Sequence, residues 1–130
     1  MQNCIFCQIV QGLSPSYKVY EDDKFFGFLD IFPTTRGHTL IVPKEHIRWV
    51  HDVPYFGLYW ETVLKLEKAI EKALKTKWVQ YITHGLIPHA HIHILPRYDE
   101  VDMGFLPKKK IDKPSDEEMR QIAEGISKNL

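Results

Sequence analysis

The sequence predicts one α+β domain, built from an antiparallel sheet of about five strands, one long helix and a C-terminal helix. Three observations lead to this prediction. The chain has 130 residues, 44% of them hydrophobic, which is enough for one compact core. Short apolar segments alternate with polar turns, and two longer segments have the period of a helix. The connections are short, which favours antiparallel neighbours in a single domain over residues 1–130.

Five segments have the length and composition of strands, and they cover residues 17–20, 25–30, 38–42, 78–83 and 89–96. The first two flank the polar turn 21–24 and predict a hairpin. The third is an apolar run ended by Pro43, which is typical of an interior strand. Pro88 and Pro96 bracket the last segment and limit how far it can pair.

Two segments carry helical signals. Over residues 53–76 the apolar side chains recur in steps of three and four, at Tyr59, Val63, Leu66, Ile70 and Leu74. Pro54 suits the first turn of this helix, where its missing N–H costs nothing. Ser115 and Glu118 match a capping box and predict a last helix over residues 116–128.

The composition argues against several classes of partner. The chain has 17 basic and 17 acidic side chains, so its net charge gives no reason to expect binding to a nucleic-acid backbone. No apolar run approaches the roughly 18 residues that a membrane span needs. The first residues carry neither a basic region nor an apolar run, which argues against a signal peptide. We therefore expect a cytoplasmic protein with neither nucleic acid nor membrane among its partners.

Three histidines alternate with apolar residues in the last predicted strand. Alternate side chains of a strand face the same way, so His89, His91 and His93 are expected on one face. The residues expected in the core are Ala90, Ile92 and Ile94. The spacing fits a solvated polar face, a metal site with imidazole ligands, or an imidazole that attacks phosphorus. Imidazole suits the last role because it is nucleophilic and titrates near physiological pH.

The chain has two cysteines, Cys4 and Cys7, in a Cys-x-x-Cys pair. A domain of this size does not need a disulfide. In an intracellular protein such a pair more often indicates metal or redox chemistry. The pair alone does not decide between the two.

Several segments, taken in order, resemble the histidine triad (HIT) nucleotide-binding family. The triad segment is PHAHIHILPR at residues 88–97, which matches the family pattern His-φ-His-φ-His-φ-φ with φ apolar. The other matching segments are CIFC at 4–7, VYED at 19–22, FLDI at 28–31 and RGHTLIVPKEHI at 36–47. The resemblance covers residues 4–98, about three quarters of the chain. It implies the HIT fold, and the chain resembles the zinc-containing bacterial and archaeal HIT hydrolases.

The resemblance implies a nucleotide hydrolase or nucleotidyl transferase. His91 would attack the α-phosphorus of a nucleoside phosphate derivative, and water would release the monophosphate from a nucleotidyl-histidine intermediate. A backbone carbonyl can hold the attacking ring in the right tautomer. His93 would hydrogen-bond near the phosphate. The implied substrates are purine nucleotides such as AMP derivatives: phosphoramidates, dinucleoside polyphosphates or adenylylated compounds.

The resemblance also implies a nucleotide site at the end of the second strand. Asp30 would accept the ribose hydroxyls, and its apolar neighbours would line a slot for the base: Phe28, Leu29 and Ile31. His38 matches another histidine near the site, with no role assigned. Arg97 is expected either at the rim of the site or on the surface, and residues 108–110 are expected to be a solvated run of lysines.

Zinc is the cofactor that the resemblance implies, with no organic cofactor. The matching ligand positions are Cys4, Cys7, His46 and His89. Four ligands of this kind form a closed structural site, which leaves no open position for substrate. The resemblance also implies a homodimer, with the long helix and a strand at the interface.

The sequence departs from the family in the loop before the triad. The loop of residues 83–88 is shorter than the corresponding loop of most members, and it lacks their usual Asn and Gly-Gln pair. His84 is expected either to replace one of these donors to the nucleotide or to be an ordinary loop residue. Two alternatives therefore remain open: a nucleotide-binding protein with little turnover, and a metal-dependent hydrolase that uses the triad as ligands.

Overall fold

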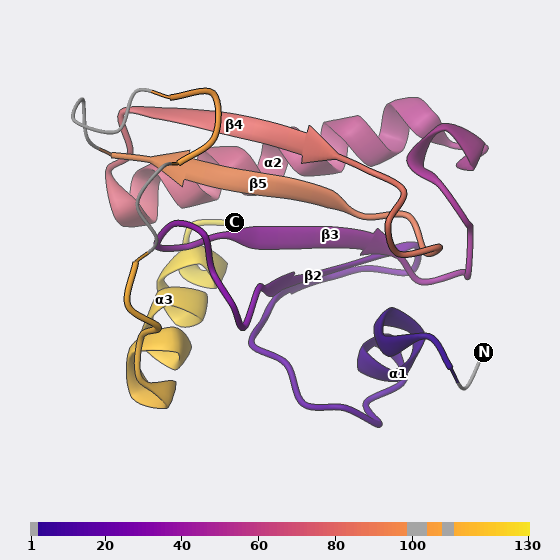
Figure 1. Cartoon of the computed structure of the whole chain (residues 1–130), viewed down its shortest axis with the longest axis horizontal. Helices are drawn as coiled ribbons and strands as arrows, with labels where there is room; N and C mark the ends of the chain where they lie inside the picture. Colours follow the sequence, from indigo (N-terminus) through magenta and orange to yellow (C-terminus); the bar gives the residue numbers. More distant parts are fainter. Residues whose placement is uncertain (1–2, 99–103, 108–110) are drawn as a thin grey trace.

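A computed structural model describes residues 3–98, 104–107 and 111–130 (Figure 1). The elements in chain order are α1 (Ile5–Val10), β1 (Lys18–Glu21), β2 (Phe25–Leu29), β3 (Thr39–Pro43), the 3₁₀ helix η1 (Val50–Asp52), α2 (Phe56–Leu74), β4 (Trp78–Thr83), β5 (Ile92–Arg97) and α3 (Asp116–Lys128). The strands form one antiparallel sheet in the order β1-β2-β3-β5-β4. The predicted α+β class is confirmed. The lysine run predicted at 108–110 lies outside the described residues.

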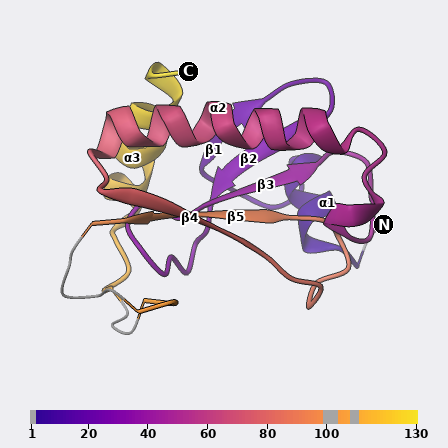
Figure 2. The same ribbon diagram turned by 90° about the horizontal axis from the view of Figure 1, so that it is seen from above.

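The sheet has a large core on one face and a small one on the other. Helices α2 and α3 lie on the same side of the sheet (Figure 2). The main core beneath them includes the three predicted core residues of the triad segment, Ala90, Ile92 and Ile94. On the opposite face α1 covers a smaller cluster made of Phe6, Phe26, Phe28, Leu40 and Val42. This small face is where the histidines gather.

Helix α2 packs on the sheet through the side chains that its period predicts. Tyr59, Val63, Leu66 and Ile70 are fully buried, and each such burial stabilises the fold by about 1.5–3 kcal/mol. A Cβ atom on Gly27 of β2 would lie 2.9 Å from Cδ2 of Leu66. The missing side chain at Gly27 therefore lets the helix approach the strand.

The ends of the long helix differ from the prediction. Helix α2 begins at Phe56 rather than at residue 53, because η1 occupies Val50–Asp52 and Pro54 lies in the connection after it. The helix ends at Leu74, since Lys75 adopts a left-handed conformation with φ of 53°. Helix α3 covers the predicted residues, and Ser115 caps it by accepting the Glu118 amide over 3.1 Å.

The triad strand begins three residues later than predicted. Strand β5 starts at Ile92, where pairing with Ile41 of β3 begins. Before that point the Ala90 amide donates to the carbonyl of Ile47 over 2.7 Å, outside the β3–β5 pairing. The short helix α1 at the Cys pair was not predicted. Among the described residues, none of the helices is long and apolar enough to cross a membrane.

Candidate functional site

The three triad histidines lie at and just before the start of β5. His93 is within the strand, opposite Leu40 of β3 and Ile82 of β4. His91 and His89 precede the strand and are 1% and 0% exposed. The rings of His91 and His93 are 5.1 Å apart, whereas the ring of His89 faces the N-terminal cysteines. The three histidines are therefore divided between two clusters: His91 and His93 lie together, and His89 lies with the cysteines.

The backbone fixes the tautomer of His91. Its Nδ1–H donates to the carbonyl of His89 over 2.8 Å, so the lone pair of the neutral ring is on Nε2. Nε2 is buried and has no hydrogen-bond partner among the described residues. Burial lowers the pKa of His91, which keeps the ring neutral near pH 7. A neutral imidazole with an unpaired Nε2 can act as a nucleophile.

Histidines from three segments form a hydrogen-bonded row beside that ring. The Thr34 amide donates to Nδ1 of His38 over 3.1 Å, so the proton of His38 is on Nε2. This Nε2–H donates to Nδ1 of His93 over 2.8 Å. Nε2 of His93 in turn faces Nε2 of His84 over 3.1 Å. A carboxylate oxygen of Asp30 lies 3.7 Å from Nε2 of His38. Burial, followed by the neighbouring histidines, lowers the pKa of His93 to about 3, so this ring is neutral.

Two members of this row had no definite role from the sequence. The sequence predicts His38 near the site without assigning it a role, and it allows His84 to be either a nucleotide-binding residue or an ordinary loop residue. Each contacts the ring of His93, at centroid distances of 5.1 and 5.0 Å. No local pattern could have revealed this, because the segments of His38 and His84 meet β5 only through the pairing of β3 and β4 with it.

The residues predicted to hold a nucleotide lie at the end of β2. Phe28 belongs to the small cluster beneath α1, with its ring 5.8 Å from that of Phe6. Asp30 is partly exposed and accepts a hydrogen bond from the amide two residues later over 2.9 Å. Ile31 is 44% exposed. Leu29 instead packs in the core beneath the helices, because alternate residues of a strand face opposite sides. The prediction that its side chain lines the base slot is wrong.

The four predicted metal ligands meet at one point. The Cys4 Sγ–His89 Nδ1 and Cys7 Sγ–His46 Nδ1 distances are both 3.2 Å. All four ligand atoms lie within 4.8 Å of one another. Helix α1 positions the thiols, since Cys4 is its N-cap and accepts the Cys7 amide over 3.4 Å. His89 donates from Nε2 to the carbonyl of Pro43 over 2.9 Å, which leaves its Nδ1 lone pair facing the sulfurs.

This geometry fits a tetrahedral zinc ion. With Zn–S near 2.3 Å and Zn–N near 2.1 Å, a tetrahedral S–N edge measures about 3.6 Å, close to the distances found here. Burial, followed by the hydrogen bond with Cys4, raises the pKa of the Cys7 thiol to about 11. Two thiolates would not lie side by side in this place unless a cation neutralised them.

The triad does not form a metal site of three histidines. His89 belongs to the cysteine cluster, so it does not converge with the other two. His91 and His93 gather instead with His84, and one ring nitrogen of each lies within 4.8 Å of the others. The part of the alternative that used all three triad residues as ligands is therefore wrong.

Comparison with known proteins identifies the family. A family model described as HIT domain matches residues 11–100. The chain belongs to the histidine triad (HIT) family. The HIT relative named Protein hit from Bacillus subtilis is 36% identical, with 99% of this chain and 95% of that protein covered. Adenosine 5'-monophosphoramidase hnt1 from Schizosaccharomyces pombe is 34% identical, with 98% of each covered.

A solved HIT structure has the same fold. The Zn-bound histidine triad family protein from Mycobacterium smegmatis superposes with a TM-score of 0.79 at 29% identity. The match covers 98% of this chain and 95% of that one. The five-stranded sheet with its helices is thus the HIT fold.

Arg97, which follows the HIT triad, does not belong to the site. It was expected at the rim or on the surface, but it is only 3% exposed. Its guanidinium lies 4.6 Å from the Trp78 ring centroid and donates to Gln80 over 2.8 Å and to the carbonyl of Gly104 over 3.0 Å. Both expectations are wrong, because Trp78 and Gln80 of β4 and the carbonyl of Gly104 contact the buried side chain.

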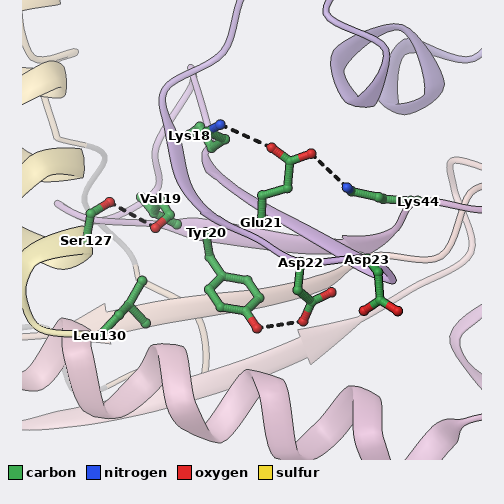
Figure 3. A pocket seen from close by; sticks show the side chains of 9 residues that line it. All are labelled: Lys18, Val19, Tyr20, Glu21, Asp22, Asp23, Lys44, Ser127 and Leu130. Atoms are coloured by element: carbon green, nitrogen blue, oxygen red, sulfur yellow. Dashed lines mark hydrogen bonds and ion pairs between the residues drawn. The ribbon is translucent and has the colours of Figure 1, made fainter.

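A hollow of about 620 Å³ lies along β1, away from the HIT histidines (Figure 3). Several of its polar groups pair with one another. Glu21 accepts from Lys18 over 3.1 Å and from Lys44 over 2.7 Å, and Ser127 donates to the carbonyl of Val19 over 2.9 Å. None of the triad histidines lines this hollow.

A second hollow, of about 270 Å³, reaches the HIT histidines. We call it the Trp49 hollow, and the residues that line it are Trp49, Val50, His51, Thr83, His84 and Gly85. His84 connects the hollow with the triad, because it lines the hollow and its ring centroid is 4.7 Å from that of His91. The Trp49 hollow thus lies beside the candidate nucleophile.

Proposed function

We propose that this chain is a nucleotide hydrolase or nucleotidyl transferase that cleaves at the α-phosphorus through a nucleotidyl intermediate on His91. The observation that carries the proposal is the buried, unpaired Nε2 of His91, with Nδ1 tied to the His89 carbonyl over 2.8 Å. The full-length S. pombe relative is named an adenosine 5'-monophosphoramidase, which supports an adenosine phosphoramidate as substrate.

The chain's own groups account for the two chemical steps. Nε2 of His91 forms a bond to phosphorus as the bond to the leaving group breaks. Water then displaces the imidazole and releases the monophosphate. In the phosphate complex, Nε2–H of His93 turns to a phosphate oxygen, and the His38 hydrogen bond of 2.8 Å fixes the tautomer that allows this.

The nucleoside end is proposed to bind at the end of β2. The Asp30 carboxylate accepts the ribose hydroxyls, which it can do because it is partly exposed. Phe28 and Ile31 supply apolar surface for a purine. Leu29 supports this site only through packing. His84 faces the other side of the phosphate.

We further propose that Cys4, Cys7, His46 and His89 hold a structural zinc ion. The converging donor atoms and the Zn-bound relative support this proposal. Such a site ties α1 to the sheet and fixes His89, whose carbonyl holds His91. With four protein ligands the ion has no open position for substrate, so it supplies stability rather than chemistry.

A homodimer in the cytoplasm completes the proposal. Helix α2 and the helix-facing side of the edge strand β4 carry exposed apolar side chains, with Leu64 50% and Tyr81 41% exposed. Such a surface favours burial against a second copy. Sedimentation equilibrium is expected to give twice the chain mass, and Leu64→Glu is expected to give the monomer.

Turnover of adenosine 5'-phosphoramidate tests the proposal. We expect AMP release by the intact chain, and a loss of at least about 10³-fold in kcat for His91→Ala. Protein quenched in an alkaline denaturant should carry an added nucleotidyl mass on the peptide that contains His91, because the P–N bond to imidazole is stable in base and labile in acid. Glu61→Gln, on the exposed side of α2, is the control and should keep full activity. Tight AMP binding without release from the phosphoramidate would favour the nucleotide-binding alternative.

A metal-dependent hydrolase remains the second candidate, because His84, His91 and His93 gather closely enough to hold an ion. It predicts that activity falls with loss of a weakly held metal and returns when the metal is added. The proposed mechanism predicts instead that turnover persists while the protein stays folded, and that the nucleotidyl adduct still forms in the presence of chelator.

A further inference from the structure

The cysteine cluster joins the thiols of the chain to the candidate nucleophile. Cys4 and Cys7 are the two cysteines of the sequence, so the thiol chemistry of the chain is confined to this one place. Both are free thiols, and their sulfur atoms lie within 4.8 Å of each other. His89 contacts both sulfurs with its ring and holds the ring of His91 with its carbonyl. A chemical change at the sulfurs can therefore reach the reacting nitrogen.

The spacing of the two cysteines also allows a disulfide. Cys4 is the N-cap of α1, and Cys7 follows three residues later in the helix. Residues three apart in a helix have Cα atoms about 5 Å apart, and a disulfide needs a Cα–Cα distance of about 4.4–6.8 Å. The two sulfurs are about 2.05 Å apart in a disulfide but about 3.8 Å apart on a tetrahedral zinc ion. The pair can therefore hold the metal or form the disulfide, but not both at once.

The two thiols differ in their access to solvent. Cys7 is only 5% exposed, whereas Cys4 is half-buried. A small oxidant from solvent therefore meets the Cys4 sulfur first, with the Cys7 sulfur close by. Cysteines that respond to oxidants typically combine an accessible sulfur with a second, resolving thiol beside it. The arrangement of the pair has both parts.

We propose that Cys4 and Cys7 are an oxidation site, at which a peroxide converts the metal-binding pair into a disulfide, releases the metal and lowers the reactivity of His91. The inference rests on the proposed zinc ion and on the proposed nucleotidyl transfer. It goes beyond both, because it gives the cysteine cluster control over turnover in addition to its effect on stability.

The oxidation balances with the peroxide as the acceptor of two electrons. The Cys4 thiolate attacks one peroxide oxygen, the O–O bond breaks, and Cys4 becomes a sulfenic acid as hydroxide leaves. The Cys7 thiolate then attacks the Cys4 sulfur, the S–O bond breaks, and a second hydroxide leaves. The pair then has no thiolate with which to hold the metal. A dithiol reverses the change by thiol–disulfide exchange.

The disulfide is expected to disturb His91 more than the nucleotide site. The ring of His89 loses its fixed position against the sulfurs, and the carbonyl of the same residue orients His91. Helix α1 has other contacts that keep it on the sheet, because Phe6 packs in the small cluster with Phe28 and its neighbours. We therefore expect kcat to change more than KM.

Hydrogen peroxide at millimolar concentration, added to the zinc-loaded chain, tests the oxidation site. We expect release of one zinc ion per chain, followed with a chromogenic chelator, and loss of two hydrogen atoms from the peptide that contains both cysteines. Dithiothreitol with added zinc should reverse both changes. Cys4→Ser is the matched control and should show no such loss of hydrogen within its chain. Retention of zinc with both thiols reduced, or a reduced chain that binds no zinc, would overturn the proposal.

Turnover of adenosine 5'-phosphoramidate at low temperature tests the effect on His91. For the oxidised chain we expect kcat to fall about tenfold and KM to change less than about threefold, with recovery in dithiothreitol and zinc. Circular dichroism gives the folded fraction, so that kcat refers to folded protein. An unchanged kcat after complete disulfide formation would overturn the control of turnover and leave the proposed function standing. Absence of turnover in the reduced, zinc-loaded chain would instead refute the proposed function, while zinc release and peptide mass would still decide the oxidation site.

Discussion

The carbonyl of His89 accepts the Nδ1–H of His91 over 2.8 Å, while the ring of His89 lies 3.2 Å from the Cys4 sulfur. His89 thus connects the cysteine cluster with the candidate nucleophile. Its side chain contacts the cysteines, and its backbone carbonyl holds the ring of His91. Any change that loosens the ring of His89 is expected to disturb the orientation of His91.

This connection predicts the outcome of removing the metal site. Cys7→Ser should abolish zinc binding, and we expect Tm to fall by about 10 °C or more, because binding free energy at such a site is folding free energy. The activity that remains at low temperature should exceed that of His91→Ala. Elemental analysis and calorimetry provide the measurements. Equal Tm values for wild type and variant would contradict the prediction.

Arg97 is predicted to stabilise the fold without serving the site. Arg97→Met removes hydrogen bonds to Gln80 and to the Gly104 carbonyl and the contact with Trp78. Loss of one partner from a buried charged network costs about 3–5 kcal/mol, here reduced because Met fills part of the space. We expect a loss of about 2–4 kcal/mol in urea unfolding and an unchanged KM for the phosphoramidate. A rise in KM without loss of stability would contradict this prediction and indicate that Arg97 contributes to substrate binding.

The buried ring of His93 predicts that stability falls in mild acid. Its pKa is lowered from 6.5 to about 3, by burial first and then by His38. Between these two values the unfolded chain binds a proton that the folded chain does not, so the free energy of unfolding decreases as pH falls from about 6.5 toward 3. His93→Gln should remove about 1–3 kcal/mol of this decrease. Urea unfolding of the wild type and of His93→Gln at pH 7 and pH 4.5 measures the difference. An equal loss of unfolding free energy in the two proteins would exclude His93 as the cause.

The close approach of α2 to β2 predicts a size-dependent defect at Gly27. Gly27→Ala would place a Cβ 2.9 Å from Leu66, and overpacking of this kind costs about 1–3 kcal/mol. In the Leu66→Ala background the same change should cost less, because the clashing Cδ2 is gone. A double-mutant cycle measured by urea unfolding gives the coupling. Strict additivity of the two changes would argue against the contact.

Much of the fold could be predicted because its signals are local. The steps of three and four that bury Tyr59 and Ile70 lie within one helix, and the cap at Ser115 involves a residue only three positions away. The strands were found for the same reason. The predicted start of β5 is wrong, because the Ala90 amide donates to the carbonyl of Ile47, a residue far away in the chain.

The α+β class follows from residue patterns along the chain, and the candidate metal ligands and the candidate nucleophile His91 follow from the ordered segments that resemble the HIT family. Only the tertiary structure decided that Arg97 is buried by β4, that Leu29 faces the helices, and that His38, His84 and His93 form one row. These outcomes depend on which strands pair and in which register, and that is set by the summed burial of the whole core rather than by any short segment.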